Sequence, residues 1–371
     1  MSQKFSVSGR HQKVFLAGVI NTAPEQAIKA AVRDAAEAAT DFSWLSKGDT
    51  VFIKLAHNSG NPYPATTSPV AVGAMIELLK DKGARWVIVG DMAGIEYVKL
   101  SPKGFSGSTR RLMAVSGMAR AVQVVGGELH CFEEDGWNSF YEDTLAVGTH
   151  WKRGPMMPAI LKDVDHIILM PRCGRHILTG STLGLKAVVG YWRSDTRLEY
   201  HHDASTLQEK TAEGNTAETL HTKQRLVITA ADKILTTHGP DKGYVCQPDF
   251  GLIIASESVV ANDMVSLAWL LLNRRNTPLS EKSVFKDPHT SQLVVSIGNR
   301  WIVNKLGGLI PAFTCEKLTG SAINSFWDDR VLKHACQVFG GLPDVLLEST
   351  NNAVPAYLKK QLSGMIVPIY S

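Results

Sequence analysis

Short apolar runs alternate with segments of helical periodicity over the first two thirds of the chain. Runs such as VFIKLA and HIILM, each bounded by polar or turn residues, are typical of buried strands. The helical segments place apolar residues three and four positions apart, as Ala31, Val32 and Ala35 show in EQAIKAAVRDAAEA. The pattern predicts strands at residues 14–20, 51–56, 86–91, 166–170, 226–232 and 250–256, and a short strand in ELHCFEED, residues 128–135.

The second and third of these runs, with the segment between them, predict a β-α-β unit. Thr67 or Ser68 can cap the intervening helix, and Pro69 suits its first turn. Strands joined in this way are parallel, and their crossover is right-handed. A further helix is expected at residues 180–190, in GSTLGLKAVVG, shortly after the run HIILM.

These elements indicate an α/β fold, with a mainly parallel sheet, helices on both faces and a helical C-terminal portion. We expect an α/β core at residues 1–275, with a polar lid or insertion at about 191–222 that closes over the site. Residues 276–371 show helical signals and few strands, so we expect a mainly helical portion packed on the core.

Polar residues follow most of the predicted strands. In an open parallel sheet, ligands bind outside the carboxyl ends of the strands. If all of the strands are parallel, these residues converge on one edge of the sheet. They are His57 and Asn58, then Asp91, then Arg172, Arg175 and His176, then Asp232 with His238, and finally Ser256 with Glu257.

Composition narrows the classes of function. The net charge is +4 over 371 residues, with no concentrated basic face, which argues against nucleic acid. The five cysteines form no Cys-x-x-Cys pair, so no iron–sulfur cluster motif is present, and their scatter fits a reducing compartment. No apolar run reaches the roughly 18 residues of a membrane span, and the N-terminus lacks a signal-peptide core. We therefore expect a cytoplasmic protein that binds neither nucleic acid nor membrane.

The stretch PRCGRHILTGSTLGLKAVVGY concentrates positive charge at a strand exit. Arginine side chains bind carboxylate or phosphate through paired hydrogen bonds. The backbone N–H groups of Thr179 to Thr182, at the N-terminus of the expected helix, would add partial positive charge. The alternative is a surface loop whose arginines pair with acids. We favour an anion site because the stretch follows a strand at its carboxyl end.

Two lysines stand in apolar surroundings. Lys54 lies inside the run VFIKLA, where a buried charge is costly unless it has a partner. Lys186 has apolar neighbours, and burial would lower its pKa and allow it to act as a base or a Schiff-base amine. The alternative for Lys186 is that its stem is buried while its ammonium group reaches water.

The run His201-His202-Asp203 is the most metal-like in the chain. With His176, Asp91, Asp232 and His238 it offers a mixed nitrogen and oxygen set suited to iron, zinc or manganese, without a diagnostic spacing. Asp91 and Asp232 can instead cap the segments that follow their strands. Asp263, on an apolar helix, is expected to bond backbone groups.

Three blocks resemble the family called DUF362, a domain of unknown function. They are TTSPVAVGAMIELLKDKGARWVIVGDMAG, then CGRHILTGSTLGLKAVVG, and finally LVITAADKILTTHGPDKG with GLIIASESVVANDMVSLAW. They occur in order over roughly Val51 to Leu270. The resemblance implies recurrent polar positions at Arg175, His176, Thr179, Thr182 and Lys186. Many relatives carry a ferredoxin-like cysteine segment that this chain lacks, and the resemblance implies no settled reaction.

Our leading hypothesis is an enzyme acting on a small anionic metabolite, by isomerisation, elimination, decarboxylation or redox chemistry at a bound metal. The alternative is a non-catalytic redox or metal-cofactor accessory protein that binds a redox partner protein. The sequence assigns no oligomeric state. The expected catalytic residues are His176, Lys186 and Asp232. Substrate contacts are expected from Lys54, His57, Asn58, Arg172, Arg175, Thr179, Thr182 and Arg193, and metal ligation from His202, His201, Asp91 and His238.

Overall fold

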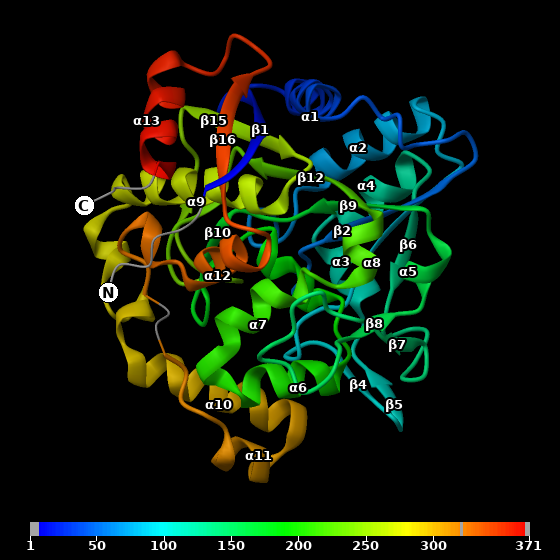
Figure 1. The fold of residues 1–371 in the computed structure, drawn as a ribbon, viewed down its shortest axis with the longest axis vertical. Coiled ribbons are helices and arrows are strands. Elements are labelled where there is room, and N and C mark those ends of the chain that lie inside the picture. The colour runs from blue at the N-terminus through cyan, green and yellow to red at the C-terminus, as the bar shows by residue number, and fades with distance from the viewer. Residues whose placement is uncertain (1–6, 320–321, 368–371) are drawn as a thin grey trace.

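An eight-stranded sheet forms the centre of the computed structural model, which describes residues 7–319 and 322–367 (Figure 1). In spatial order its strands are β16 (Leu342–Ser349), β1 (Val7–Ile20), β15 (Phe250–Ser256), β12 (Gln224–Ala231), β9 (His166–Met170), β2 (Thr50–Leu55), β3 (Trp86–Asp91) and β6 (Glu128–Cys131). The six strands predicted from the apolar runs are all present, β6 confirms the short strand expected in residues 128–135, and β16 completes the sheet.

The sheet is mainly parallel, as predicted, and β15 alone among its described strands runs the opposite way. β15 pairs antiparallel with both β1 and β12, whereas the other pairings are parallel. The expectation that all strand ends meet at one edge is therefore wrong for Ser256 and Glu257. Ser256 lies at the opposite edge, where its hydroxyl donates to the backbone oxygen of Lys13 over 2.9 Å.

Helices cover both faces of the sheet, because the side chains of its central strands are buried on both. Val51, Ile53 and Leu55 of β2 pack in a core with α1 (Glu25–Ala39), α2 (Pro69–Asp81) and α4 (Met118–Val124). Phe52 packs in a separate core on the other face. Lys54, two positions further, shares the face of Phe52 because side chains alternate along a strand. That face carries the candidate site.

The β2-α2-β3 unit forms as its sequence predicts. The Ser68 hydroxyl accepts a hydrogen bond from the Ala71 N–H over 3.4 Å, and Pro69 occupies the first turn of α2. β2 and β3 pair in parallel register over five residue pairs, from Thr50 with Trp86 to Lys54 with Gly90. The carboxyl ends of β2 and β3 therefore lie side by side.

The helix expected at residues 180–190 is wrong in its first half. β10 (Gly174–His176) and β11 (Gly180–Thr182) form a hairpin, and a 3-10 helix, η1 (Leu185–Gly190), begins only afterwards. The carboxylate of Asp263, on α9 (Val259–Arg275), accepts the backbone N–H groups of Gly184 and Leu185, both over 2.7 Å. This cap comes from 78 residues away in the chain, so local sequence does not reveal it.

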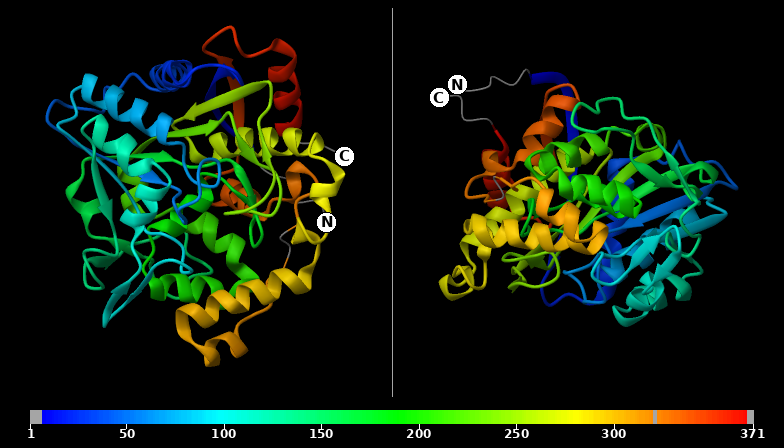
Figure 2. Two further views of the ribbon diagram at one scale, coloured as in Figure 1. Left: turned by 180° about the vertical axis from the view of Figure 1, so that it is seen from behind. Right: turned by 90° about the horizontal axis from the view of Figure 1, so that it is seen from below.

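Residues 191–222 form packed helices: α6 (Ser194–His202), α7 (Leu207–Gly214) and the start of α8 (Glu218–Lys223). The C-terminal portion contributes α10 (Gln292–Gly307), α11 (Leu309–Thr314), α12 (Arg330–Val338) and α13 (Ala356–Ile366), in addition to β16. α10 packs on α6 and α12 on α7. Figure 2 shows α10 and α11 (gold) at the end of the molecule away from α13 (red).

Small elements complete the fold. The hairpin of β4 (Lys99–Ser101) and β5 (Gly104–Ser106) precedes α3 (Thr109–Val115), and β7 (Phe140–Glu142) pairs with β8 (Met156–Pro158). The remaining elements are α5 (Ile160–Asp163), β13 (Ile234–Leu235), β14 (Val245–Cys246) and the 3-10 turns η2 (Ala204–Thr206), η3 (Leu279–Lys282), η4 (Pro288–Thr290) and η5 (Phe326–Asp328). None of the helices in the described ranges has the length and apolarity needed to cross a bilayer.

Candidate functional site

A cavity of about 450 Å³ lies at the carboxyl ends of β2, β3 and β9. One wall is apolar and comes from α10, through Trp301, Ile302 and Leu306. The rest of the lining is rich in nitrogen. Its polar side chains include Lys54, His57, Asn58, Asp91, Arg172, Thr182, His176, Lys186, Arg197, His201, His238 and Asp241.

Lys54 and Asp91 form a buried ion pair at the floor of the cavity. The Lys54 Nζ is 2.9 Å from Asp91 Oδ1 and also donates to the backbone oxygens of Leu55 (2.5 Å) and Ala187 (3.1 Å). Burial lowers the pKa of Lys54, and the neighbouring Asp91 carboxylate opposes that shift. Because an ammonium group has three donors, this pattern leaves Lys54 none for a ligand.

Both carboxylate oxygens of Asp91 also accept hydrogen bonds within the protein. Its Oδ2 accepts the backbone N–H of His57 over 2.6 Å, and its Oδ1 accepts that of Met92 over 2.8 Å. A Cβ built on Gly190 would lie 2.3 Å from Asp91 Oδ1 and 2.5 Å from Lys54 Nζ. Glycine at this position therefore lets η1 close over the ion pair.

Three further cations line the cavity without an acidic partner. In the described part of the chain, no carboxylate forms an ion pair with Arg172, Arg197 or Lys186. Arg172 donates to the Ala65 backbone oxygen and to Thr182 Oγ1. Arg197 donates to three backbone oxygens, those of Met92, Ala93 and Gly190, at 2.8 to 3.1 Å.

Arg172 and Arg197 each keep N–H donors that form no hydrogen bond within the described part of the protein. A guanidinium group has five N–H donors. Arg172 uses two of them in its protein hydrogen bonds, and Arg197 uses three. Both side chains are over nine-tenths buried. Their remaining donors are thus held in place on side chains that line the cavity.

Lys186 reaches the cavity from η1, with its Nζ 5.6 Å from the centre of the Tyr200 ring. Burial lowers the pKa of Lys186 to about 7, and the positive charges of Arg172, Arg197 and Lys54 act in the same direction. A lysine with this pKa is part amine and part ammonium at neutral pH. It can therefore accept a proton or attack a carbonyl carbon.

His176 is held as a neutral hydrogen-bond donor. Its Nδ1 accepts the backbone N–H groups of Leu178 (3.1 Å) and Thr179 (3.4 Å), so the ring proton of the neutral form is on Nε2. Burial lowers the pKa of His176 well below its usual value, and the charge of Lys186 adds to this. His176 is therefore suited to donate a hydrogen bond to a ligand.

His201 has the opposite tautomer. Asn299 Nδ2 donates to the His201 backbone oxygen over 2.8 Å, which orients the amide so that Asn299 Oδ1 accepts from His201 Nδ1 over 2.9 Å. The unprotonated atom is then Nε2. Burial lowers the pKa of His201 to about 3. The cavity thus combines one imidazole that donates at Nε2 with one that accepts there.

The mouth of the cavity is held by the loop that follows β13. Gly239 has φ +59°, and a Cβ there would lie 1.7 Å from the Arg175 backbone oxygen. Its own backbone oxygen accepts the N–H of Ile177 over 3.2 Å. Asn58 Nδ2 donates to Asp241 Oδ1 in the same loop. Glycine is needed here so that the loop can approach β10 closely.

The structure brings most of the expected residues together. Those that line the cavity are Lys54, His57, Asn58, Asp91, Arg172, His176, Thr182, Lys186, His201 and His238. Burial lowers the pKa of His57 to about 4, and the pKa of His238 is lowered for the same reason. His57 Nε2 lies 3.2 Å from the hydroxyl of Ser116, which itself donates to a backbone oxygen, so His57 Nδ1 is unprotonated.

Besides His202, described below, four expected residues lie elsewhere. Arg175 neighbours His176 on β10, and alternation along the strand turns it away from the cavity. Thr179 donates its hydroxyl to the Ser181 backbone oxygen within the hairpin. Arg193 pairs with Asp195 at 2.8 Å. Asp232 accepts the Tyr63 hydroxyl over 2.7 Å, and burial raises the Asp232 pKa.

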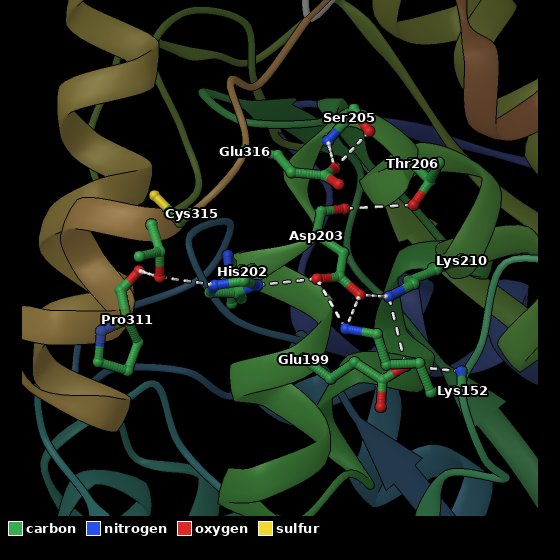
Figure 3. A network of polar contacts seen from close by, with 12 residues as sticks. Lys152, Glu199, His202, Asp203, Ser205, Thr206, Lys210, Pro311, Cys315 and Glu316 are labelled. Atoms are coloured by element: carbon green, nitrogen blue, oxygen red, sulfur yellow. Dashed lines mark hydrogen bonds and ion pairs between the residues drawn. The ribbon is translucent and has the colours of Figure 1, made fainter.

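The expected metal ligands do not gather around one point. His202 Nδ1 is 2.8 Å from Asp203 Oδ1, within a network of lysines and acids (Figure 3). His202 Nε2 is 3.2 Å from Thr314 Oγ1 on α11. Asp91 is occupied by Lys54 and two N–H groups. Across the described residues, the one group of three ligand atoms close enough for a metal is His150, Glu213 and His334, outside this cavity.

Sequence reasoning missed Arg197 and the wall from α10. Arg197 lies inside a polar helix whose charges look solvated, and only the buried face of α6 distinguishes it. Thr196, Arg197, Tyr200 and His201 are the buried residues of α6 and recur at helical spacing. That spacing is the signal that could have identified Arg197.

The chain is similar to a family of known sequences and to a solved structure. A family model described as "Domain of unknown function (DUF362)" matches residues 51–268. No match was found among curated proteins. Among solved structures, the lactate racemase apoprotein from Thermoanaerobacterium thermosaccharolyticum is similar at a TM-score of 0.40 and 13% identity. That alignment covers 60% of this chain and 50% of the other, so the chain spans about half of its length.

Proposed function

This chain belongs to the DUF362 family, a domain of unknown function, and from its cavity we propose an enzyme that acts on a small anionic metabolite. The observation that carries the proposal is a set of cavity-lining cations that form no ion pair with a described acid. Arg172 and Arg197 are over nine-tenths buried, and Lys186 is partly exposed. Burying a charge without a partner costs several kcal/mol. A bound anion would supply the missing negative charge.

The two arginines are proposed to bind the anionic group. A carboxylate or phosphate can accept the donors that Arg172 and Arg197 do not use within the protein. The Lys54–Asp91 pair has no donor left, so its proposed role is to hold β2, β3 and η1 in register beneath the ligand. Asn58 and Thr182 contribute polar atoms at the rim and wall.

Proton transfer beside the bound carboxylate is the reaction that this set of groups supports best. The neutral amine of Lys186 would take the proton from the adjacent carbon, and the electron pair of that bond would move onto the carboxylate or carbonyl oxygen. The Nε2–H of His176 and the free donors of Arg172 would stabilise the resulting oxyanion. Delivery of a proton to the other face of that carbon, or to a neighbouring atom, completes an isomerisation, and departure of a neighbouring group with its bonding electrons completes an elimination.

Binding of anions tests the first half of the proposal. Malonate, citrate and phosphate should each be titrated calorimetrically at about pH 6, where Lys186 is protonated. Arg172→Ala should weaken the best of them by roughly 10- to 100-fold, the cost of losing hydrogen bonds to a charged group. Arg193→Ala is the matched control, because Arg193 pairs with Asp195 and does not line the cavity. Equal affinity in the wild type and Arg172→Ala would remove the basis of the proposal.

Isotope exchange tests the second half. Small carboxylic acids that bind should lose the proton beside the carboxylate to D₂O in the presence of the wild-type protein, as followed by NMR. Lys186→Met should abolish the exchange while leaving the fold intact. Binding without exchange for every acid would indicate a non-catalytic binding protein instead.

A further inference from the structure

Two histidines and a glutamate meet at a point outside the cavity. His150 lies in the loop between β7 and β8, Glu213 on α7 and His334 on α12. Each offers one ligand atom, and these atoms all lie within 4.8 Å of one another. Three separate parts of the chain thus converge on one small volume.

The two imidazoles approach the same carboxylate oxygen. Glu213 Oε1 is 2.6 Å from His150 Nδ1 and 3.1 Å from His334 Nε2. The ring centres are 5.3 Å apart, with an interplanar angle of 76°. In a tetrahedral zinc site, bonds of about 2.0–2.1 Å put neighbouring ligand atoms about 3.3 Å apart. Shifts of roughly 1 Å would therefore convert the cluster into a coordination site.

Supporting hydrogen bonds orient the ligands. His334 Nδ1 is 3.0 Å from Gln337 Oε1, so Nδ1–H donates there and Nε2 is left as the ligand atom. Glu213 Oε2 accepts the backbone N–H of His150 over 3.1 Å, which holds the carboxylate. With Nδ1 protonated, His334 Nε2 faces a Glu213 carboxylate oxygen over 3.1 Å, so either a proton or a metal ion must lie between these two acceptor atoms.

We propose that His150, Glu213 and His334 bind a divalent transition-metal ion of the zinc class, with water at the remaining position. Two imidazoles and a carboxylate are a donor set that Zn²⁺ and Co²⁺ both accept. The Glu213 side chain is 0% exposed, whereas those of His150 and His334 are 29% and 17% exposed. A hydrated ion can therefore reach the ligands from the histidine side.

The charges around the cluster are compatible with a cation. Glu209 lies one turn before Glu213 on α7 and is paired with Arg330 at 2.8 Å. The Glu213 carboxylate contacts both histidines and would neutralise part of the charge of a metal ion bound there.

The bound ion would act as a staple between distant segments. It would join the loop after β7, the helical segment 194–223 and the C-terminal α12. α7 packs against η1 and α6, which carry Lys186 and Arg197 to the cavity. The metal would thus stabilise the wall of the cavity without entering it.

Cobalt binding to the 371-residue chain tests the proposal. The protein should be freed of metal with a chelator and titrated with Co²⁺ at neutral pH. We expect one equivalent to produce the visible absorption bands of a low-coordinate Co²⁺ ion, and Zn²⁺ to displace it and raise the melting temperature. Affinity should fall at acid pH, because the histidines must be unprotonated to bind.

Single substitutions locate the ion. His150→Ala and His334→Ala should each abolish the cobalt bands, and Gln337→Ala should weaken binding roughly 10- to 100-fold by removing the supporting hydrogen bond. His130→Ala is the matched control, because His130 pairs with a single acid, Asp135, at 2.9 Å. Circular dichroism of each variant verifies the fold.

Two outcomes would overturn the proposal. One is an unchanged cobalt spectrum at stoichiometric metal and micromolar wild-type protein. The other is loss of the bands in His201→Ala with retention in His150→Ala and His334→Ala, which would place the ion in the cavity. Neither outcome depends on whether the cavity binds an anion.

Discussion

Two charge-rich regions are built from the same stretch of chain, and they differ in how their charges are paired. Around Asp203, two lysines and a histidine each have an acid: Lys210 Nζ lies 3.0 Å and Lys152 Nζ 2.9 Å from Oδ2, and His202 Nδ1 lies 2.8 Å from Oδ1 (Figure 3). In the cavity, Arg172, Arg197 and Lys186 have no such partner among the described residues. A complete network holds helices together, whereas an incomplete one is suited to receive a ligand.

The pKa directions separate the two regions in the same way. Burial would raise the pKa of Asp203, but hydrogen bonds from His202, Lys152 and Lys210 outweigh it and lower that pKa. In the cavity, burial lowers the pKa of Lys186 and no acid offsets it. The first region is most stable when its groups are charged, and the second is destabilised by its own charge until an anion binds.

The largest expected effect on stability comes from breaking the ion pair between Lys54 and Asp91 in the cavity. Lys54→Met leaves the Asp91 carboxylate buried without its ammonium partner, so the free energy of unfolding should fall by about 3–5 kcal/mol in denaturant titrations. Gly190→Ala, which crowds the same pair, should also be destabilising. A change below about 1 kcal/mol for Lys54→Met would show that Asp91 is compensated in another way.

Lys186 should couple anion binding to pH. Below its pKa of about 7 the group is an ammonium, so anion affinity should be highest there and should fall as the pH rises through 7. The free protein should show the reverse trend, because the folded state binds fewer protons than the unfolded state between about pH 7 and 10.5, so its stability rises with pH in that window. Both trends should be absent in Lys186→Met, as measured by calorimetry and thermal melting.

Removing one lysine from the network around Asp203 should lower the free energy of unfolding by less than Lys54→Met does. In Lys210→Met, Asp203 keeps Lys152 and His202, so we expect a loss of about 1–2 kcal/mol in the free energy of unfolding. Anion affinity should be unchanged, which calorimetry of the variant checks. Weakened anion binding with an unaltered fold would mean that the two regions are not separate.

The smallest expected effects come from the neighbouring residues His201 and His202, whose substitution should affect different properties. His202→Ala should change stability by less than about 1 kcal/mol and leave anion binding intact, since His202 lies in the partly exposed network. His201→Ala should alter anion affinity, because His201 lines the cavity. Parallel titrations of the two variants test this. Equal anion affinity in both would contradict the assignment of His201 to the cavity and of His202 to the network around Asp203.

Much of this arrangement could be predicted from the sequence because strands end where apolar runs end. Lys54, His57, Asp91 and Arg172 lie in or just after such runs, and the sheet brings those ends together. The direction of β15 could not be predicted, since the period of a strand pattern is the same whichever way the strand runs.

The errors share a physical cause, which is dependence on distant parts of the chain. The start of η1 is set by a carboxylate on α9, and the apolar wall of the cavity by α10. Arg175 was expected in the site because the hairpin was not recognised, and a two-residue alternation then turns it away. Arg197 depends on which face of α6 is buried, and that is set by α10, about a hundred residues later in the chain.

The place of β1 has a consequence for how the chain reaches its native state. β1 precedes both of its neighbours in the sheet by a long stretch of chain, because β15 and β16 begin at residues 250 and 342. Pairings of such high sequence separation form slowly, because a long loop must close first. Both edges of β1 therefore stay unpaired until β15 and β16 have been synthesised, and a nascent chain must keep this apolar strand from pairing elsewhere.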